Sequence, residues 1–109
     1  MGDLKVKSRQ WIVDENDRII MGQGRSQILE SIEKTGSINK AAKLLKMSYK
    51  AVWSKIRATE EHLGARVVDA DRRLGTRLTP EGRRLLEKYR RFRSRCIREE
   101  ERIFRDIFG

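Results

Sequence analysis

The sequence predicts one mainly α-helical domain over residues 1–109, with two short β-hairpins. Three observations predict this fold class. Three short amphipathic helical patterns follow one another, a hairpin pattern comes after them, and one long helical pattern runs to the C-terminus. Hydrophobic residues make up 38% of the chain and charged residues 39%, which suits a small core or one shared with a second copy.

An N-terminal hairpin is expected over residues 4–21. Residues 4–13, LKVKSRQWIV, partly alternate between apolar and polar side chains. The sequence DEND then indicates a turn, and RIIM supplies a second short apolar strand.

Three helices are expected within residues 24–64. The first helix presents Ile28 and Ile32 on one face, and Gly36 stands where a helix commonly ends. Two further helical patterns follow with room for only a turn between them. Their apolar positions indicate that all three helices share one core.

Residues 37–64 have the pattern of a helix-turn-helix. Ser37 can cap the first of these two helices and Ser48 the second, because a serine hydroxyl accepts a hydrogen bond from a free N–H at a helix start. The pair Ala41-Ala42 is small enough for the two helices to pack closely. The turn position that is often glycine is Lys46, which either takes a left-handed conformation or bends the chain otherwise.

A second hairpin is expected over residues 66–78, where a β-branched pair, a charged tip and another short apolar run follow one another. Thr79-Pro80-Glu81 then opens a helix. Thr79 can cap it, proline lacks only an N–H that would have no partner, and glutamate suits the positive helix end. This order of elements is that of a winged helix-turn-helix, with residues 66–78 as the wing.

The final helix is expected over residues 79–108. About 28 residues would span about 42 Å, which is longer than a core of this size can cover. A second copy of the chain is the expected partner for the outer half, in a two-fold dimer. The apolar seam, which Glu99 interrupts, consists of Leu85, Tyr89, Phe92, Cys96, Ile103 and Ile107.

The helix expected over residues 48–63 has one side free to enter a major groove, while Val52 and Ile56 face the core. Its outward hydroxyls and cations can contact phosphates and base edges. Two interpretations stay open for Trp53, which lies either at the edge of the core or against DNA. The predicted DNA contacts are Ser48, Tyr49, Lys50, Trp53, Ser54 and Arg57 on this helix, with Arg72, Arg73 and Arg77 in the wing.

The composition favours a polyanionic partner. There are 26 Lys and Arg residues against 16 Asp and Glu, a formal charge of +10, which points to nucleic acid first and an acidic membrane surface second. No apolar run approaches the ~20 residues that cross a bilayer. The single cysteine fits a reducing compartment, so a cytoplasmic, membrane-free protein is expected.

Signs of catalysis or metal binding do not appear in the sequence. His62 is the only histidine, and no metal-ligand spacing or phosphate-binding glycine loop is present. We therefore expect no enzyme activity and no cofactor. Carboxylates such as Glu60 and Glu61 are interpreted as helix surface paired with neighbouring cations.

Two stretches, GSINKAAKLLKMSYKAVWSKI and LTPEGRRLLEKY, resemble the DNA-binding domain of the ModE family of molybdate-responsive regulators and, more distantly, LysR-type regulators. The resemblance covers roughly residues 24–92. It implies that the helix beginning at Ser48 reads an operator. It also implies that the first and last helices build a homodimer, which adds Ile28 and Ile32 to the predicted dimer contacts. At matching positions it supports Ser37, Ser48, Tyr49, Lys50, Arg57 and Thr79 as DNA contacts.

The chain departs from that family in two places. Full-length members carry a C-terminal oxyanion-binding domain, and this chain ends before one could begin. A stand-alone module that acts with a separate effector-sensing protein is therefore expected. The wing tip, DADRRLG, replaces the glycine-rich tip of the family, so its groove contacts are expected to differ.

Our hypothesis from the sequence is a homodimeric transcriptional regulator of bacterial type that binds double-stranded DNA sequence-specifically. Two alternatives stay open. One is a sequence-tolerant architectural DNA-binding protein, and the other is a winged-helix module that binds an acidic protein.

Overall fold

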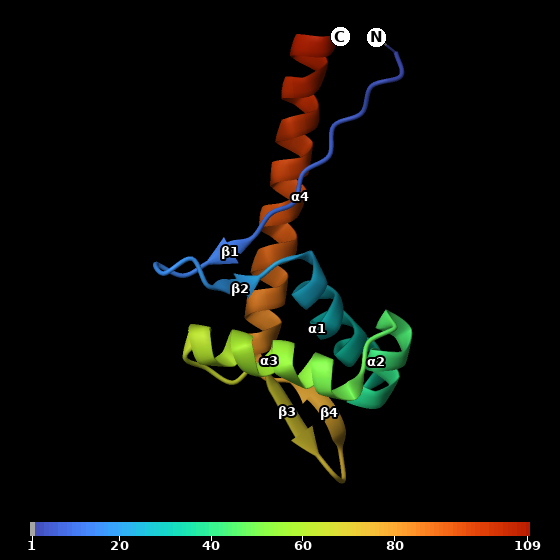
Figure 1. The fold of residues 1–109 in the computed structure, drawn as a ribbon, viewed down its shortest axis with the longest axis vertical. Helices are drawn as coiled ribbons and strands as arrows, with labels where there is room; N and C mark the ends of the chain where they lie inside the picture. Colours follow the sequence, from blue (N-terminus) through green and yellow to red (C-terminus); the bar gives the residue numbers. More distant parts are fainter. Residues whose placement is uncertain (1) are drawn as a thin grey trace.

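The computed structural model describes residues 2–109, in which three helices and two antiparallel hairpins are arranged around a fourth, long helix (Figure 1). This helix, α4 (Pro80–Phe108), forms the long axis of a molecule that measures 54 × 31 × 21 Å. The other helices and the second hairpin gather around its first turns, and its last turns project away from them (Figure 1). The predicted fold class is confirmed.

The N-terminal hairpin consists of β1 (Ile12–Val13) and β2 (Ile19–Met21), and it is shorter than predicted. Because β2 has only three residues, the chain before Ile12 has no strand to pair with. Residues 4–10 form no strand and run in extended form beside the outer half of α4 (Figure 1). The turn is held by Asp14, whose carboxylate accepts hydrogen bonds from the backbone N–H groups of Asn16 and Arg18.

The helix-turn-helix follows helix α1 (Gln23–Thr35) and consists of α2 (Ile38–Leu45) and α3 (Tyr49–Leu63). The predicted caps are confirmed, since Ser37 Oγ accepts from Lys40 N and Ser48 Oγ accepts from Ala51 N. Gly36 and Gly64 end α1 and α3 in the left-handed conformation that glycine adopts without strain.

The turn between α2 and α3 has Lys46 in the left-handed region, at φ 55°. Of the two conformations that the sequence left open, the lysine therefore takes the left-handed one. The chain accepts a backbone strain that glycine would avoid.

The wing consists of β3 (Val68–Asp71) and β4 (Gly75–Leu78), paired so that Val68 faces Leu78. The wing is tied to α1 through β4, because Thr76 N donates to Gly36 O at 3.0 Å. It is also tied to the start of α4, because Thr79 N donates to Val67 O at 3.0 Å.

Helix α4 is clamped against the wing at Gly82. A Cβ at this position would lie 2.1 Å from Val67 O, so only glycine allows the helix to approach this strand. Leu86 and Tyr89 continue the buried side of α4, and the Tyr89 hydroxyl donates to Gln10 O at 2.8 Å. Burial raises the pKa of this hydroxyl.

The core lies where the helices, β2 and the base of the wing meet. Its buried hydrophobic residues are Ile20, Met21, Ile28, Leu29, Ile32, Ile38, Ala41, Ala42, Val52, Ile56, Val67, Val68, Leu78, Leu86 and Tyr89. Helix α4 is long but rich in charged residues. Among residues 2–109 no helix has an apolar stretch that could cross a membrane.

Three residues predicted as dimer contacts belong to this core. Ile28, Ile32 and Tyr89 are 3%, 0% and 3% exposed, which leaves almost no surface for a second chain. Their apolar sides are used inside the protomer by the helices and strands packed on α1 and α4. Leu85 is half-buried and also packs against the core. The exposed part of the predicted seam is therefore Phe92, Ile103 and Ile107, with half-buried Cys96 beside it.

Candidate nucleic-acid interface

Helix α3 is anchored on one side and free on the other. Val52 and Ile56 are 0% and 2% exposed, as the sequence predicts for the core side. Tyr49 is 51% exposed, and three further predicted contacts on this helix, Lys50, Ser54 and Arg57, are also exposed. The structure therefore brings these four predicted contacts together on the outer side of α3.

Trp53 lies at the edge of the core, where it is half-buried and packs against the buried cluster. Tyr49 meets it edge to face, with the ring centroids 6.5 Å apart. Arg57 Cζ lies 4.8 Å from the centroid of the Trp53 ring, which favours a cation–π interaction. The indole thus supports the two neighbours that point outward, and a direct DNA contact by Trp53 stays a prediction.

Three of the predicted hydroxyl contacts, Ser37, Ser48 and Thr79, already make hydrogen bonds at helix starts and differ in whether a donor is left for DNA. Ser37 and Ser48 accept bonds as helix caps, and their O–H groups can still donate to a phosphate. Thr79 already uses both roles, because its Oγ1 accepts from Gly82 N and donates to Arg66 O at 2.6 Å. Thr79 therefore joins the wing to α4 and has no free donor for DNA.

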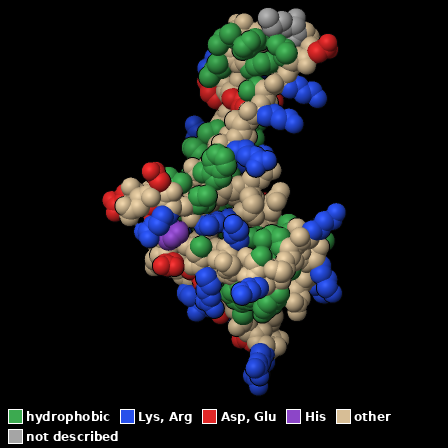
Figure 2. Space-filling model, in the orientation of Figure 1, with side chains coloured by type: hydrophobic (Ala, Val, Ile, Leu, Met, Phe, Trp, Pro, Cys, Tyr) green, Lys and Arg blue, Asp and Glu red, His purple; other side chains and the backbone are tan. Residues whose placement is uncertain are grey.

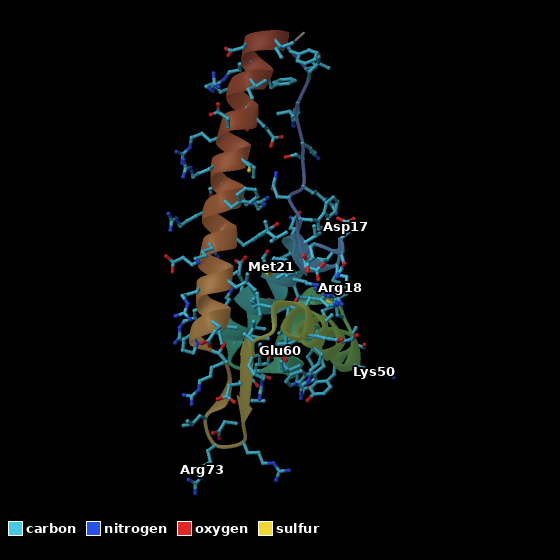
Figure 3. All side chains as sticks on the ribbon, turned by 90° about the vertical axis from the view of Figure 1, so that its left-hand side faces the viewer. Asp17, Arg18, Met21, Lys50, Glu60 and Arg73 are labelled. Atoms are coloured by element: carbon cyan, nitrogen blue, oxygen red, sulfur yellow. The ribbon has the colours of Figure 1, made fainter. Side chains whose placement is uncertain are left out.

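Arg72 and Arg73 are both exposed at the wing tip, where Arg73 points away from the body (Figure 3). The turn of the wing tip is fixed by Asp71, whose Oδ1 accepts from Arg73 N at 2.7 Å and from Leu74 N at 3.2 Å. These N–H groups lower the pKa of Asp71, and the charge of Arg77 lowers it further. Arg77 itself is exposed on β4.

Basic side chains cluster on the part of the surface that includes α2, α3 and the wing tip (Figure 2). Acidic side chains appear on the same face at the turn of the N-terminal hairpin (Figure 2). Lys50 and Arg73 mark two ends of the basic region and both point away from the body (Figure 3). Such a distribution attracts the phosphates of a nucleic acid to the helix-turn-helix and wing.

Residues 25–83 match the family described as bacterial regulatory helix-turn-helix proteins, lysR family. The chain belongs to this family. The family and the fold are both those of DNA-binding transcription regulators and not of enzymes. The predicted resemblance to LysR-type regulators is thereby confirmed.

Two curated relatives connect this LysR-type domain to ModE. The molybdenum transport protein ModE of Azotobacter vinelandii is 44% identical over 70 residues, which are 61% of this chain and 26% of that protein. The molybdenum-pterin-binding protein MopB of Rhodobacter capsulatus is 38% identical over 82 residues, 72% of this chain and 30% of that protein. The chain spans less than a third of either relative.

Solved LysR-type structures have the same fold. The CbnR_DBD–DNA complex superimposes with a TM-score of 0.63 at 26% identity, over 75% of this chain and 93% of that one. The BenM_DBD/catB site 1 DNA complex has a TM-score of 0.63 at 21% identity, over 82% of this chain and 99% of that one. At this lower identity the second likeness concerns the fold alone.

The interpretation of Glu60 as helix surface paired with a neighbouring cation was half right. Glu60 does face Arg57 one turn away, but it is only 8% exposed and accepts backbone hydrogen bonds from Val67 and Val68 at the base of the wing. The sequence could have predicted this burial, because Glu60 continues the four-residue spacing of Val52 and Ile56 and so lies on the core side of α3. Glu61, the next residue, is exposed as predicted.

Among residues 2–109 no three His, Cys, Asp or Glu side chains gather in a way that could hold a metal ion. The groups that the outer side of α3 and the wing offer to a ligand are hydroxyls, an aromatic ring and cations.

Proposed function

We propose that this chain is a sequence-specific, DNA-binding transcriptional regulator that acts as a homodimer. The observation that carries the proposal is the outer side of α3, where Tyr49, Lys50, Ser54 and Arg57 are exposed on a helix anchored by buried Val52 and Ile56. The family and the basic surface around α2, α3 and the wing support it.

In the proposed complex α3 enters a major groove and the wing lies on the flanking backbone. Lys50 and Arg57 contact base edges, and a good base contact contributes about 1–3 kcal/mol of discrimination. Arg72, Arg73 and Arg77 bind phosphates, which makes the affinity salt-dependent. Ser37 and Ser48 donate from their capping positions, while a contact from Trp53 is open.

The exposed apolar side of the outer α4 supports the homodimer. Phe92, Ile103 and Ile107 are 45%, 46% and 70% exposed, and half-buried Cys96 lies between the first two along the helix. A second copy would cover these side chains and place two α3 helices about 34 Å apart, in successive major grooves.

Selection of bound sequences from random duplexes tests the DNA-binding part. The selected site should bind at least ~10³-fold more tightly than random duplex, at each of two salt concentrations. Lys50→Ala should relax the sequence preference, whereas Arg72→Ala should weaken binding evenly across sequences. Equal affinity for all duplexes would indicate an architectural DNA-binding protein, and no binding at low salt would indicate a protein-interaction module.

Analytical ultracentrifugation tests the homodimer. Ile103→Glu should convert a dimer to a folded monomer, because it places a charge in the proposed seam. Arg105→Glu is the control, because it changes the charge by two units on the far side of α4, two residues along the helix. A dimer that survives Ile103→Glu unchanged would refute the proposed seam.

The molybdenum-related names of ModE and MopB are not carried over, because the matched region covers less than a third of either protein. A separate effector-sensing protein and a cytoplasmic location stay predictions from the sequence.

A further inference from the structure

A buried carboxylate lies between the two parts that the proposed function brings to DNA. Glu60 comes from the last turns of α3, and its side chain turns inward toward the base of the wing (Figure 3). Only 8% of the residue is exposed. A buried charge is stable only where it is paired and hydrogen-bonded, so its partners define what it does.

The two oxygens of Glu60 have different partners. Oε2 accepts from Val67 N at 2.9 Å and from Val68 N at 3.3 Å, and Arg66 Nε lies 3.6 Å away. Oε1 faces Arg57 at 3.4 Å. One carboxylate thereby joins Val67 and Val68, where the chain enters β3, to Arg57, a predicted base-reading residue of α3.

The wing has separate hydrogen bonds to α1 and to the start of α4. Gly36 O holds Thr76, and Val67 O holds Thr79. These bonds connect the wing to α1 and α4 but not to the recognition helix. Among residues 2–109, Glu60 is the only α3 side chain that is hydrogen-bonded to the wing strands or the residue leading into them.

We propose that Glu60 is a positioning residue that couples the recognition helix to the wing, so that α3 and the wing tip reach DNA at one fixed angle. The inference rests on the proposed DNA-binding function. The two amide bonds fix the point after α3 at which the chain enters β3. A small rotation of the hairpin at that point would displace Arg72, at its far end, by a larger distance. Without Glu60 the wing keeps its fold and its bonds to α1 and α4 but loses its fixed angle to α3.

The test compares the contribution of the wing in three backgrounds: unchanged, Glu60→Met and Glu61→Met. Methionine is used rather than glutamine, because the amide oxygen of glutamine could keep both bonds to Val67 N and Val68 N. Glu60→Met keeps the approximate size of the side chain but removes the charge and both acceptors. Glu61→Met is the matched control, because it makes the same change at the neighbouring, exposed position. Affinity for the selected duplex is measured in each background with and without Arg72→Ala.

In the unchanged chain Arg72→Ala should weaken binding about 10-fold, the loss of one charged hydrogen bond. The Glu61→Met background should give the same factor. With Glu60→Met the factor should fall below about 3, because a wing without a fixed angle to α3 contributes little for Arg72→Ala to remove. A general loss of stability would instead leave the factor of Arg72→Ala unchanged, and that result would overturn the proposal.

Circular dichroism shows whether each variant folds, and Glu60→Asp, which keeps the charge but is too short to reach Val67 N and Val68 N, replaces Glu60→Met if needed. Hydrogen exchange in the unchanged protein is an independent check. The Val67 and Val68 amides should exchange at least ~100-fold more slowly than Arg72 N–H. Equal rates would overturn the proposal. Failure of the unchanged protein to bind any duplex would instead refute the proposed function itself.

Discussion

The two halves of α4 have similar apolar patterns but different surroundings. Between Pro80 and Tyr89 the helix buries Gly82, Leu86 and Tyr89 against the body. Beyond Tyr89 no residue of α4 is buried. The apolar side chains of Ile103 and Ile107 stay 46% and 70% exposed.

The outer half is held mainly by contacts within the helix. Arg102 pairs with Glu99 one turn before it and with Asp106 one turn after it. The extended N-terminal residues add a hydrogen bond from Ser8 Oγ to Glu100. Exposed ion pairs of this kind contribute little stability. The inner half of α4 is therefore held by the core of the protomer, whereas the outer half keeps an apolar surface that the protomer does not bury.

The largest expected effect breaks the inner half. Gly82→Ala would place a Cβ 2.1 Å from Val67 O, so the helix and the wing must separate. We expect the free energy of unfolding to fall by about 4 kcal/mol or more, measured by urea denaturation. Gly24→Ala is the control, because a Cβ there meets no atom within 4 Å. It should leave stability unchanged or raise it by up to about 1 kcal/mol.

The second prediction sets the two halves against each other. Leu86 is 1% exposed and Phe92 is 45% exposed. In the Ile103→Glu chain, which should be monomeric, Leu86→Ala should lower the free energy of unfolding by about 3 kcal/mol through a cavity in the core. Phe92→Ala should cost less than about 1 kcal/mol in the same urea measurement. Equal losses would show that the outer half is buried in the monomer after all.

A third substitution tests whether Tyr89 marks the boundary between the buried half and the exposed half of α4. Tyr89→Phe removes the hydroxyl that donates to Gln10 O, and should lower stability by about 1 kcal/mol. Hydrogen exchange should speed up in residues 8–13 while the amides of α3 keep their rates. Tyr49→Phe is the matched control at a 51% exposed site and should change stability by less than about 0.5 kcal/mol. No difference between the two variants would remove Tyr89 as the anchor of the N-terminal segment.

The smallest effect concerns the exposed wing tip. The Asp71 pKa is lowered in the folded protein by the N–H groups of Arg73 and Leu74, so the bonded turn is favoured fully above the ordinary value of ~3.9. The stabilisation is lost as the pH falls through the lowered folded value. The amide signals of Arg73 and Leu74 in NMR spectra should shift with a midpoint below ~3.9. Asp71→Asn should abolish that transition, and a midpoint above the ordinary value would contradict the described turn.

Local signals were enough for the helix boundaries and for the family. Ser37, Ser48 and Thr79 cap the predicted helices because capping depends on residues only a few positions away. The apolar spacing of α3 likewise separated buried Val52 and Ile56 from the exposed reading face. The resemblance to ModE and LysR-type regulators also came from short motifs, and the family match confirms it.

The sequence by itself determined the fold class, the helix-turn-helix and the side of α3 that faces outward, since each depends on periodicity or on a cap. Only the tertiary structure decided which neighbour covers each apolar or polar side chain. The Tyr89 hydroxyl donates to Gln10 O, and the Thr79 hydroxyl donates to Arg66 O just before the wing. Glu60 is buried and accepts from Val67 N, which links α3 to the wing. Periodicity gives the face of a helix on which a residue lies, but its partners come from chain segments that no local pattern specifies.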